Sequence, residues 1–189
     1  MQKDLFGKKI IDKKRKTRLE MSLLKYDKNS LQERIERLKY INKIFPKRYG
    51  IAADMETVYV FSEAKMAFIN GEFISTILLC QAFIERNLQM YYERIGLSGI
   101  GRRGLKAILD HAKKNKTIIS YLIEKIDELR KKRNPFVHLK EIEHEYNLDR
   151  RMFKALEEGR PFKQPFEILQ EDAKASISLM YAVFITKLD

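Results

Sequence analysis

Apolar residues recur at spacings of three and four along most of this 189-residue chain. Between Lys116 and His138 they form a single stripe on a helix, made of Ile119, Leu122, Ile123, Ile126 and Leu129. No segment shows the period-two alternation or the turn residues that are typical of a sheet. The sequence therefore predicts an all-α fold in which this helix buries one face.

Helix-stop residues divide the rest of the chain into further predicted helices. Asn70-Gly71 separates two of them, because glycine adopts left-handed backbone geometry at little cost. Four glycines between residues 96 and 104 indicate a connection. We expect helices over about residues 31–44, 52–69, 72–95, 105–114, 148–158 and 166–188.

The border between an N-terminal extension and the main domain is expected near residue 50. Ser30 and Glu33 fit a capping box, so the 31–44 helix should begin there. Pro46 and Gly50 then end that helix, and only a short helix near residues 19–24 is expected before it. The chain is thus divided into a basic helical extension and a helical domain, residues 1–50 and 51–189.

Positive charge is concentrated in the extension. Residues 1–50 hold 16 Lys and Arg against 6 Asp and Glu, whereas residues 51–189 hold 22 against 20. Dense positive charge gathers polyanions by releasing their counterions, which makes nucleic acid the expected partner. A lysine-rich tail that only keeps the protein soluble is the alternative reading.

Composition argues against several other classes of protein. The single cysteine, Cys80, excludes an internal disulfide and lies in an apolar run, so we expect a small core residue and a reducing, cytoplasmic location. No apolar stretch approaches the roughly 20 residues that cross a bilayer, and the N-terminus lacks a signal peptide's apolar core. We therefore expect neither secretion nor a membrane partner.

Arg133 and His138 form the candidate site. Arg133 lies seven residues after Ile126, so it ends the core-facing stripe of the predicted helix. Pro135 disfavours helical geometry at Asn134, so the helix should stop there, and His138 can then fold back towards the guanidinium.

The segment Arg133-Asn134-Pro135-Phe136-Val137-His138 resembles the R-x4-6-H motif of the HEPN superfamily. Beyond these six residues, the resemblance is a helical pattern over roughly residues 52–188. It implies an up-and-down helical bundle and a metal-independent endoribonuclease, often a toxin or host-defence effector, that cuts RNA as a homodimer. The resemblance to a toxin family also makes a cognate antitoxin a possible further partner.

The residue types suit metal-free RNA cleavage by attack of the 2′-hydroxyl. Histidine has both protonation states available near neutrality, so His138 is the candidate acid and base. Arginine is permanently cationic and forked to meet two phosphate oxygens, so Arg133 is the candidate phosphate clamp. Asn134 would orient the histidine, the phosphate or the partner's loop, and no cofactor is expected.

Further residues are predicted to support the site. Glu85 resembles the acidic residue frequent in the long HEPN helix before the motif and would pair with Arg133, although an ordinary surface salt bridge is the alternative. Contacts to RNA are expected from exposed basic side chains, namely Lys13, Lys14, Arg15, Lys16, Arg18, Arg102, Arg103 and Arg130.

Less specific interpretations stay open at this point. Arg133 could simply be a cation that stabilises the negative end of the helix dipole, and His138 could be an ordinary loop histidine. His138, Glu141 and His144 are metal-ligand types, but residues three and six apart leave one another's helical face, so we expect no metal site. The alternative to an enzyme is a non-catalytic HEPN-like RNA-binding or protein-interaction scaffold.

Overall fold

The computed structural model describes residues 17–45 and 53–186, and within them the backbone forms helices and no strand. The protein is therefore all-α, as the periodicity predicted. The chain divides into two compact units, residues 1–33 and 34–189. Within the described residues, no helix combines the length and apolar character that a bilayer span requires.

The first helix, α1 (Arg18–Ile44), begins earlier than the capping-box prediction placed it. The Oγ1 of Thr17 accepts the amide of Glu20 at 3.2 Å, and the Glu20 carboxylate accepts the amide of Thr17 at 2.6 Å. These are the reciprocal bonds of a capping box. The Ser30 hydroxyl instead donates to the carbonyl of Asp27 inside the helix. The same motif occurs twice, and the first copy starts the helix.

The second unit begins before the expected border at residue 50, because the last turns of α1 belong to it. Arg37 is 7% exposed, and its Nε donates to the carbonyl of Ile69 at 2.8 Å, at the end of α2 (Met55–Asn70). Ile41 is 2% exposed in the hydrophobic core. Residues 34–44 are therefore part of the helical domain, which the sequence had placed at 51–189.

Gly71 joins α2 to α3 (Phe73–Arg94) in a left-handed conformation with φ of 84°. A Cβ at this position would also lie 3.1 Å from the Arg37 guanidinium. Glycine is thus required both by the backbone angle and by the close approach of Arg37. The predicted stop at Asn70-Gly71 is confirmed.

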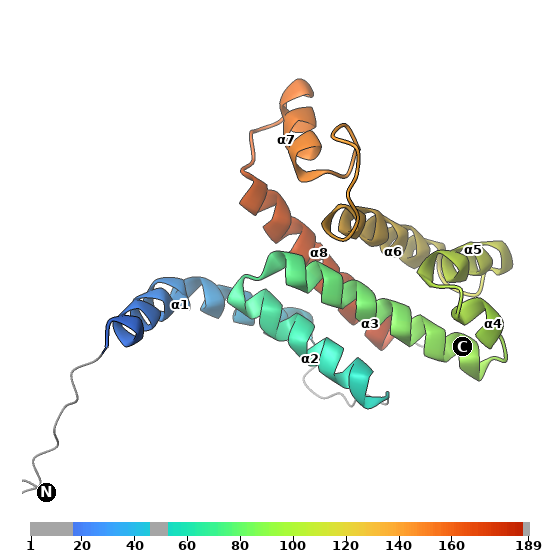
Figure 1. Ribbon diagram of the computed structural model, residues 1–189. Helices are drawn as coiled ribbons and strands as arrows, with labels where there is room; N and C mark the ends of the chain where they lie inside the picture. The colour runs from blue at the N-terminus through green and yellow to red at the C-terminus, as the bar shows by residue number, and fades with distance from the viewer. Residues whose placement is uncertain (1–16, 46–52, 187–189) are drawn as a thin grey trace, which may run out of the picture. The chain divides into compact units, whose positions relative to one another are not determined.

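The core of the second unit lies where α3 packs between α2 and α8 (Pro165–Ile185), as Figure 1 shows. Phe61 of α2 contacts three aromatic rings of α3 and α8, with centroid distances of 5.1–5.6 Å to Phe83, Phe184 and Tyr181. Cys80 of α3 is fully buried, and burial raises the pKa of its thiol. It is a core residue, as its apolar surroundings predicted.

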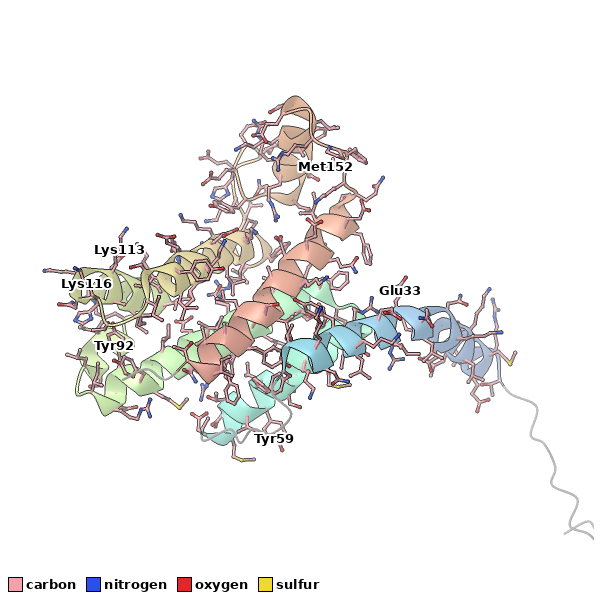
Figure 2. All side chains as sticks on the ribbon, turned by 180° about the vertical axis from the view of Figure 1, so that it is seen from behind. Glu33, Tyr59, Tyr92, Lys113, Lys116 and Met152 are labelled. Atoms are coloured by element: carbon pink, nitrogen blue, oxygen red, sulfur yellow. The ribbon has the colours of Figure 1, made fainter. Side chains whose placement is uncertain are left out.

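Three more helices lead to the motif. A short helix, α4 (Ser98–Gly101), precedes α5 (Leu105–Asn115), and α6 (Ser120–Arg133) follows. The Tyr92 side chain, labelled in Figure 2, contacts the α5 residue His111, with 3.0 Å between its hydroxyl and Nδ1. One residue of the predicted stripe was wrong: Ile119 precedes α6 and is 65% exposed, while Ile118 is buried.

Candidate functional site

The motif lies where α6 gives way to a single 3-10 turn, η1 (Asn134–Phe136). The α-helix ends at Arg133, but Asn134 keeps right-handed helical angles, φ −54° and ψ −42°, which the following proline was expected to disfavour. The Asn134 carbonyl accepts the amides of Val137 at 3.1 Å and His138 at 2.9 Å. These bonds offset the cost of the conformation, and Asn134 positions His138 through its main chain.

Arg133 is half-buried, and its Nε is enclosed without an acceptor among the described residues. The three basic residues before it are all ion-paired. Arg130 and Lys131 contact Asp127 at 2.8 and 3.2 Å, and Lys132 contacts Glu128 and Asp172 at 2.9 and 3.1 Å. Within residues 17–45 and 53–186, no carboxylate is paired with Arg133.

Lys132 is held in its charged form by its surroundings. Burial alone would lower its pKa, but the hydrogen bond to Glu128 and the charge of Asp172 outweigh burial and raise it. Lys132 therefore stays protonated near neutrality and cannot serve as the base of the site.

His138 differs from the other two histidines of the chain in having no side-chain partner in the described residues. His111 contacts the Tyr92 hydroxyl, and the Nδ1 of His144 accepts the amide of Tyr146 at 3.3 Å. The His138 side chain is exposed. Its imidazole is therefore open to a ligand.

Glu85 serves a different helix from the one expected. Its Oε1 accepts the amide of Leu105 at 3.0 Å, which caps the first turn of α5. In the described part of the chain, no ion pair joins Glu85 to Arg133. The spacing along α3 could not reveal this contact, because it depends on how α5 packs against α3.

Replacing Glu85 by alanine should therefore weaken α5 and lower the free energy of unfolding by about 1 kcal/mol, the cost of losing a helix cap. The melting temperature should fall by roughly 2–4 °C. Glu85→Gln keeps an acceptor oxygen and should retain most of the stability. The exposed Glu93 of the same helix supplies the control, since Glu93→Ala should change little. A Glu85→Ala protein of unchanged stability would contradict the capping role.

Of the three predicted RNA contacts that lie in the second unit, only Arg130 is on the helix that carries the motif. Arg102 and Arg103 are exposed in the turn between α4 and α5. This turn lies near the start of α6 in Figure 1, whereas the motif lies at the other end of α6. Arg130 is half-buried and bonded to Asp127. Arg18 is exposed at the start of α1, in the first unit. Lys13, Lys14, Arg15 and Lys16 lie outside the described residues.

The segment after the motif is a loop, although its residue types are those of metal ligands. The Asn147 side-chain amide donates to the carbonyls of Glu141 at 2.6 Å and Ile142 at 3.0 Å, which closes the loop before α7 (Leu148–Glu157). Within residues 17–45 and 53–186, no group of three or more His, Cys, Asp or Glu side chains is placed to hold a metal ion.

A buried charged cluster beside the motif was not anticipated from the sequence. Asp172 of α8 is 4% exposed and accepts both Nη groups of Arg151 from α7, at 2.5 and 2.9 Å, besides the Lys132 ammonium. The cluster ties the end of α6 to α7 and α8. The one available signal was an aspartate next to Ala173 in the apolar helix predicted over residues 166–188.

Comparison with protein-family models, with curated proteins and with solved structures found no match to this chain. The functional argument therefore rests on the residues of the chain itself.

Proposed function

We propose that this protein is a metal-independent endoribonuclease of the HEPN type. One observation carries the proposal: the arginine without a carboxylate partner and the histidine without a side-chain partner, among the described residues, flank the same 3-10 turn. An unpaired guanidinium can bind two phosphate oxygens, and an exposed imidazole can exchange protons. Arg133 and His138 thus supply the two chemical functions that the cleavage needs.

In the proposed reaction, a base removes the proton of the 2′-hydroxyl, and that oxygen bonds to the adjacent phosphorus. The bond from phosphorus to the 5′-oxygen then breaks, and an acid protonates the leaving oxygen. Arg133 stabilises the negative charge that gathers on the phosphate oxygens. His138 acts as acid or base, and a second copy of the chain would supply the other histidine, so the proposed enzyme is a homodimer.

The surplus of positive charge in residues 1–50 supports RNA as the substrate, because it adds affinity without sequence preference. A role as toxin or host-defence effector follows from the resemblance alone. An exposed apolar loop favours the second candidate, a non-catalytic interaction scaffold: Leu139 is 101% exposed and Ile142 86%. Activity measurements separate the two.

The first test is cleavage of single-stranded RNA with and without a chelator. We expect equal rates in both, and products with 2′,3′-cyclic phosphate and 5′-hydroxyl ends. Protein that binds RNA and never cuts it would favour the scaffold. Cleavage that stops with chelator would place the chemistry on a metal ion instead.

Arg133→Ala should lower the cleavage rate of bound RNA by at least about 100-fold, because electrostatic stabilisation of the transition state is lost. Arg133→Lys keeps the charge without the fork and should recover only part of the rate. Arg130→Ala, one turn earlier, is the matched control. It should weaken RNA binding modestly and leave the rate of bound substrate unchanged, since Asp127 already holds that guanidinium. Equal effects of the two alanine variants would argue against the clamp.

A further inference from the structure

Positive charge in the helical domain is concentrated on a strip around α5. Residues 102–116 hold six Lys and Arg against one Asp, whereas the other residues of 51–189 hold 16 against 19. All six cationic side chains are exposed, and Figure 2 labels two of them, Lys113 and Lys116, near each other at the end of α5. The α5 strip, as we call it, consists of Arg102, Arg103, Lys106, Lys113, Lys114 and Lys116.

Five of the six cations form no ion pair with any described residue. Only Lys106 is paired, with Asp110 at 2.5 Å, and these two side chains are 61% and 60% exposed. The helix dipole does not account for the strip, because Arg102 and Arg103 lie just before α5, where the positive end of its dipole disfavours cations. The strip therefore holds uncompensated charge of the kind that binds polyanions by releasing their counterions.

A groove between α5 and α6 leads away from the strip. Its volume is about 240 Å³, and Lys106 and Lys113 line it from α5. Glu124 and Asp127 line it from α6. The axes of two packed helices lie about 8–10 Å apart, so a groove between them admits a single nucleic-acid strand and not a duplex.

The α6 face that lines this groove continues to His138. Lys131 lies seven residues after Glu124, and His138 lies seven residues after Lys131, and seven residues make about two helical turns. The amide of His138 bonds to the carbonyl of Asn134 at 2.9 Å, so the chain keeps its helical turn through η1. Glu124, Lys131 and His138 therefore lie on one side, over about 21 Å at 1.5 Å per residue.

We propose that the α5 strip and this face of α6 form a track for single-stranded RNA that leads to His138. The inference rests on the proposed ribonuclease activity and adds to it where the rest of the substrate binds. Backbone phosphates contact the unpaired cations of the strip, and the strand then follows the groove to the motif. Phosphate contacts carry no base information, so the track selects for the length of the RNA and not for its sequence.

Most carboxylates along the track are neutralised by neighbouring cations. Asp110 contacts Lys106, and Asp127 contacts two cations of α6. Glu124 is exposed and has no ion pair with a described residue. Among the described residues that line the groove, it is the one uncompensated negative charge. Glu124 therefore opposes RNA binding and provides a test in the opposite direction.

The first test measures binding of the full-length chain to a labelled single-stranded RNA whose 2′-hydroxyls are all methylated, so that it cannot be cut. Changing both Lys113→Gln and Lys116→Gln should flatten the slope of log affinity against log salt by about 1.4, or about 0.7 for each lost contact. If both proteins bind equally at about 1 M salt, this is roughly 25-fold weaker binding at about 0.1 M.

The control removes the same charge elsewhere. Lys154 of α7 and Lys163 before α8 are 52% and 45% exposed, so Lys154→Gln with Lys163→Gln should leave the affinity and the salt slope nearly unchanged. Glu124→Gln should tighten RNA binding several-fold, because a charge that repels phosphate is removed. Asp149→Asn removes the same charge from exposed α7 surface and should have little effect.

Cleavage measurements separate the track from the proposed chemistry. At saturating protein, the double lysine variant should cut bound RNA at the wild-type rate, because the strip lies away from the scissile phosphate. Below saturation it should lose the same roughly 25-fold with RNA of about 16 nucleotides and little with RNA of about 4, which reaches too little of the track. A wild-type chain that never cuts RNA would remove the chemistry, and the binding measurements would still decide the track.

Three results would overturn the proposal. The double lysine variant could keep the wild-type RNA affinity and salt slope, which would make the strip a solvated surface. It could lose no more affinity than the Lys154 and Lys163 control, which would make the effect one of net charge. Finally, the wild type could bind anionic phospholipid vesicles and the lysine variant could lose that binding alone, which would assign the strip to a membrane surface.

Discussion

His138→Ala is expected to lower the rate of RNA cleavage by about 10²–10⁴-fold, the usual contribution of a general acid or base. The exposed side chain has no partner in the described residues, so its loss should leave the melting temperature and the binding of RNA nearly unchanged. The measurement is single-turnover cleavage of RNA at saturating protein, accompanied by thermal unfolding of both proteins.

His144→Ala is the control for this variant, because it removes the same chemical group six residues away. The ring of His144 accepts the amide of Tyr146, so this change should affect the loop and leave the cleavage rate within a few-fold. Cleavage that persists in His138→Ala, or that falls equally in both variants, would remove His138 from the proposed mechanism.

Asp172→Ala is expected to cause the largest loss of stability. It removes the carboxylate that pairs with Arg151 and Lys132, whose side chains are only 19% and 22% exposed. The change leaves Arg151 without a carboxylate and Lys132 with Glu128 alone. This costs about 3 kcal/mol here, at the lower end for buried pairs because both cations retain some access to water. The melting temperature should fall by roughly 6–12 °C, as measured by thermal unfolding.

The neighbouring Glu171 supplies the control for Asp172. Its carboxylate contacts Lys163 at 2.7 Å, but the two side chains are 60% and 45% exposed. Exposed ion pairs contribute about 0–1 kcal/mol, so Glu171→Ala should have a small effect. If both variants lost the same small amount of stability, the Asp172 cluster would be no more important than a surface pair.

Local pattern was enough to predict most of the helices. The predicted ends at Asn70-Gly71 and before Pro135 agree with α2 and α6. Glycine ends α2 by its left-handed conformation. Proline has no amide to continue α6, but it does not move Asn134 out of helical geometry as was expected. The start of α1 was missed because the capping-box motif occurs at both Thr17 and Ser30. Either site satisfies the local rule, and the pattern does not rank them.

The sequence predicted some features of the candidate site and missed others. The spacing from Ile126 to Arg133 predicted that the arginine would approach the core, and Arg133 is indeed half-buried with an enclosed Nε. The spacing did not show that Asp172, 40 residues after Lys132, would pair with Lys132 and Arg151, and that Arg133 would have no carboxylate partner among the described residues. Nor did it show that Glu85 would cap α5.

By itself the sequence determined the all-α class, the approximate helix ends and the positions of Arg133 and His138 on either side of one turn. All of these follow from interactions between residues within about one helical turn of each other. Only the tertiary structure decided which charges are paired and which face of α1 is covered. Those outcomes depend on how far each helix is rotated and displaced against its neighbours, and no local spacing contains that information.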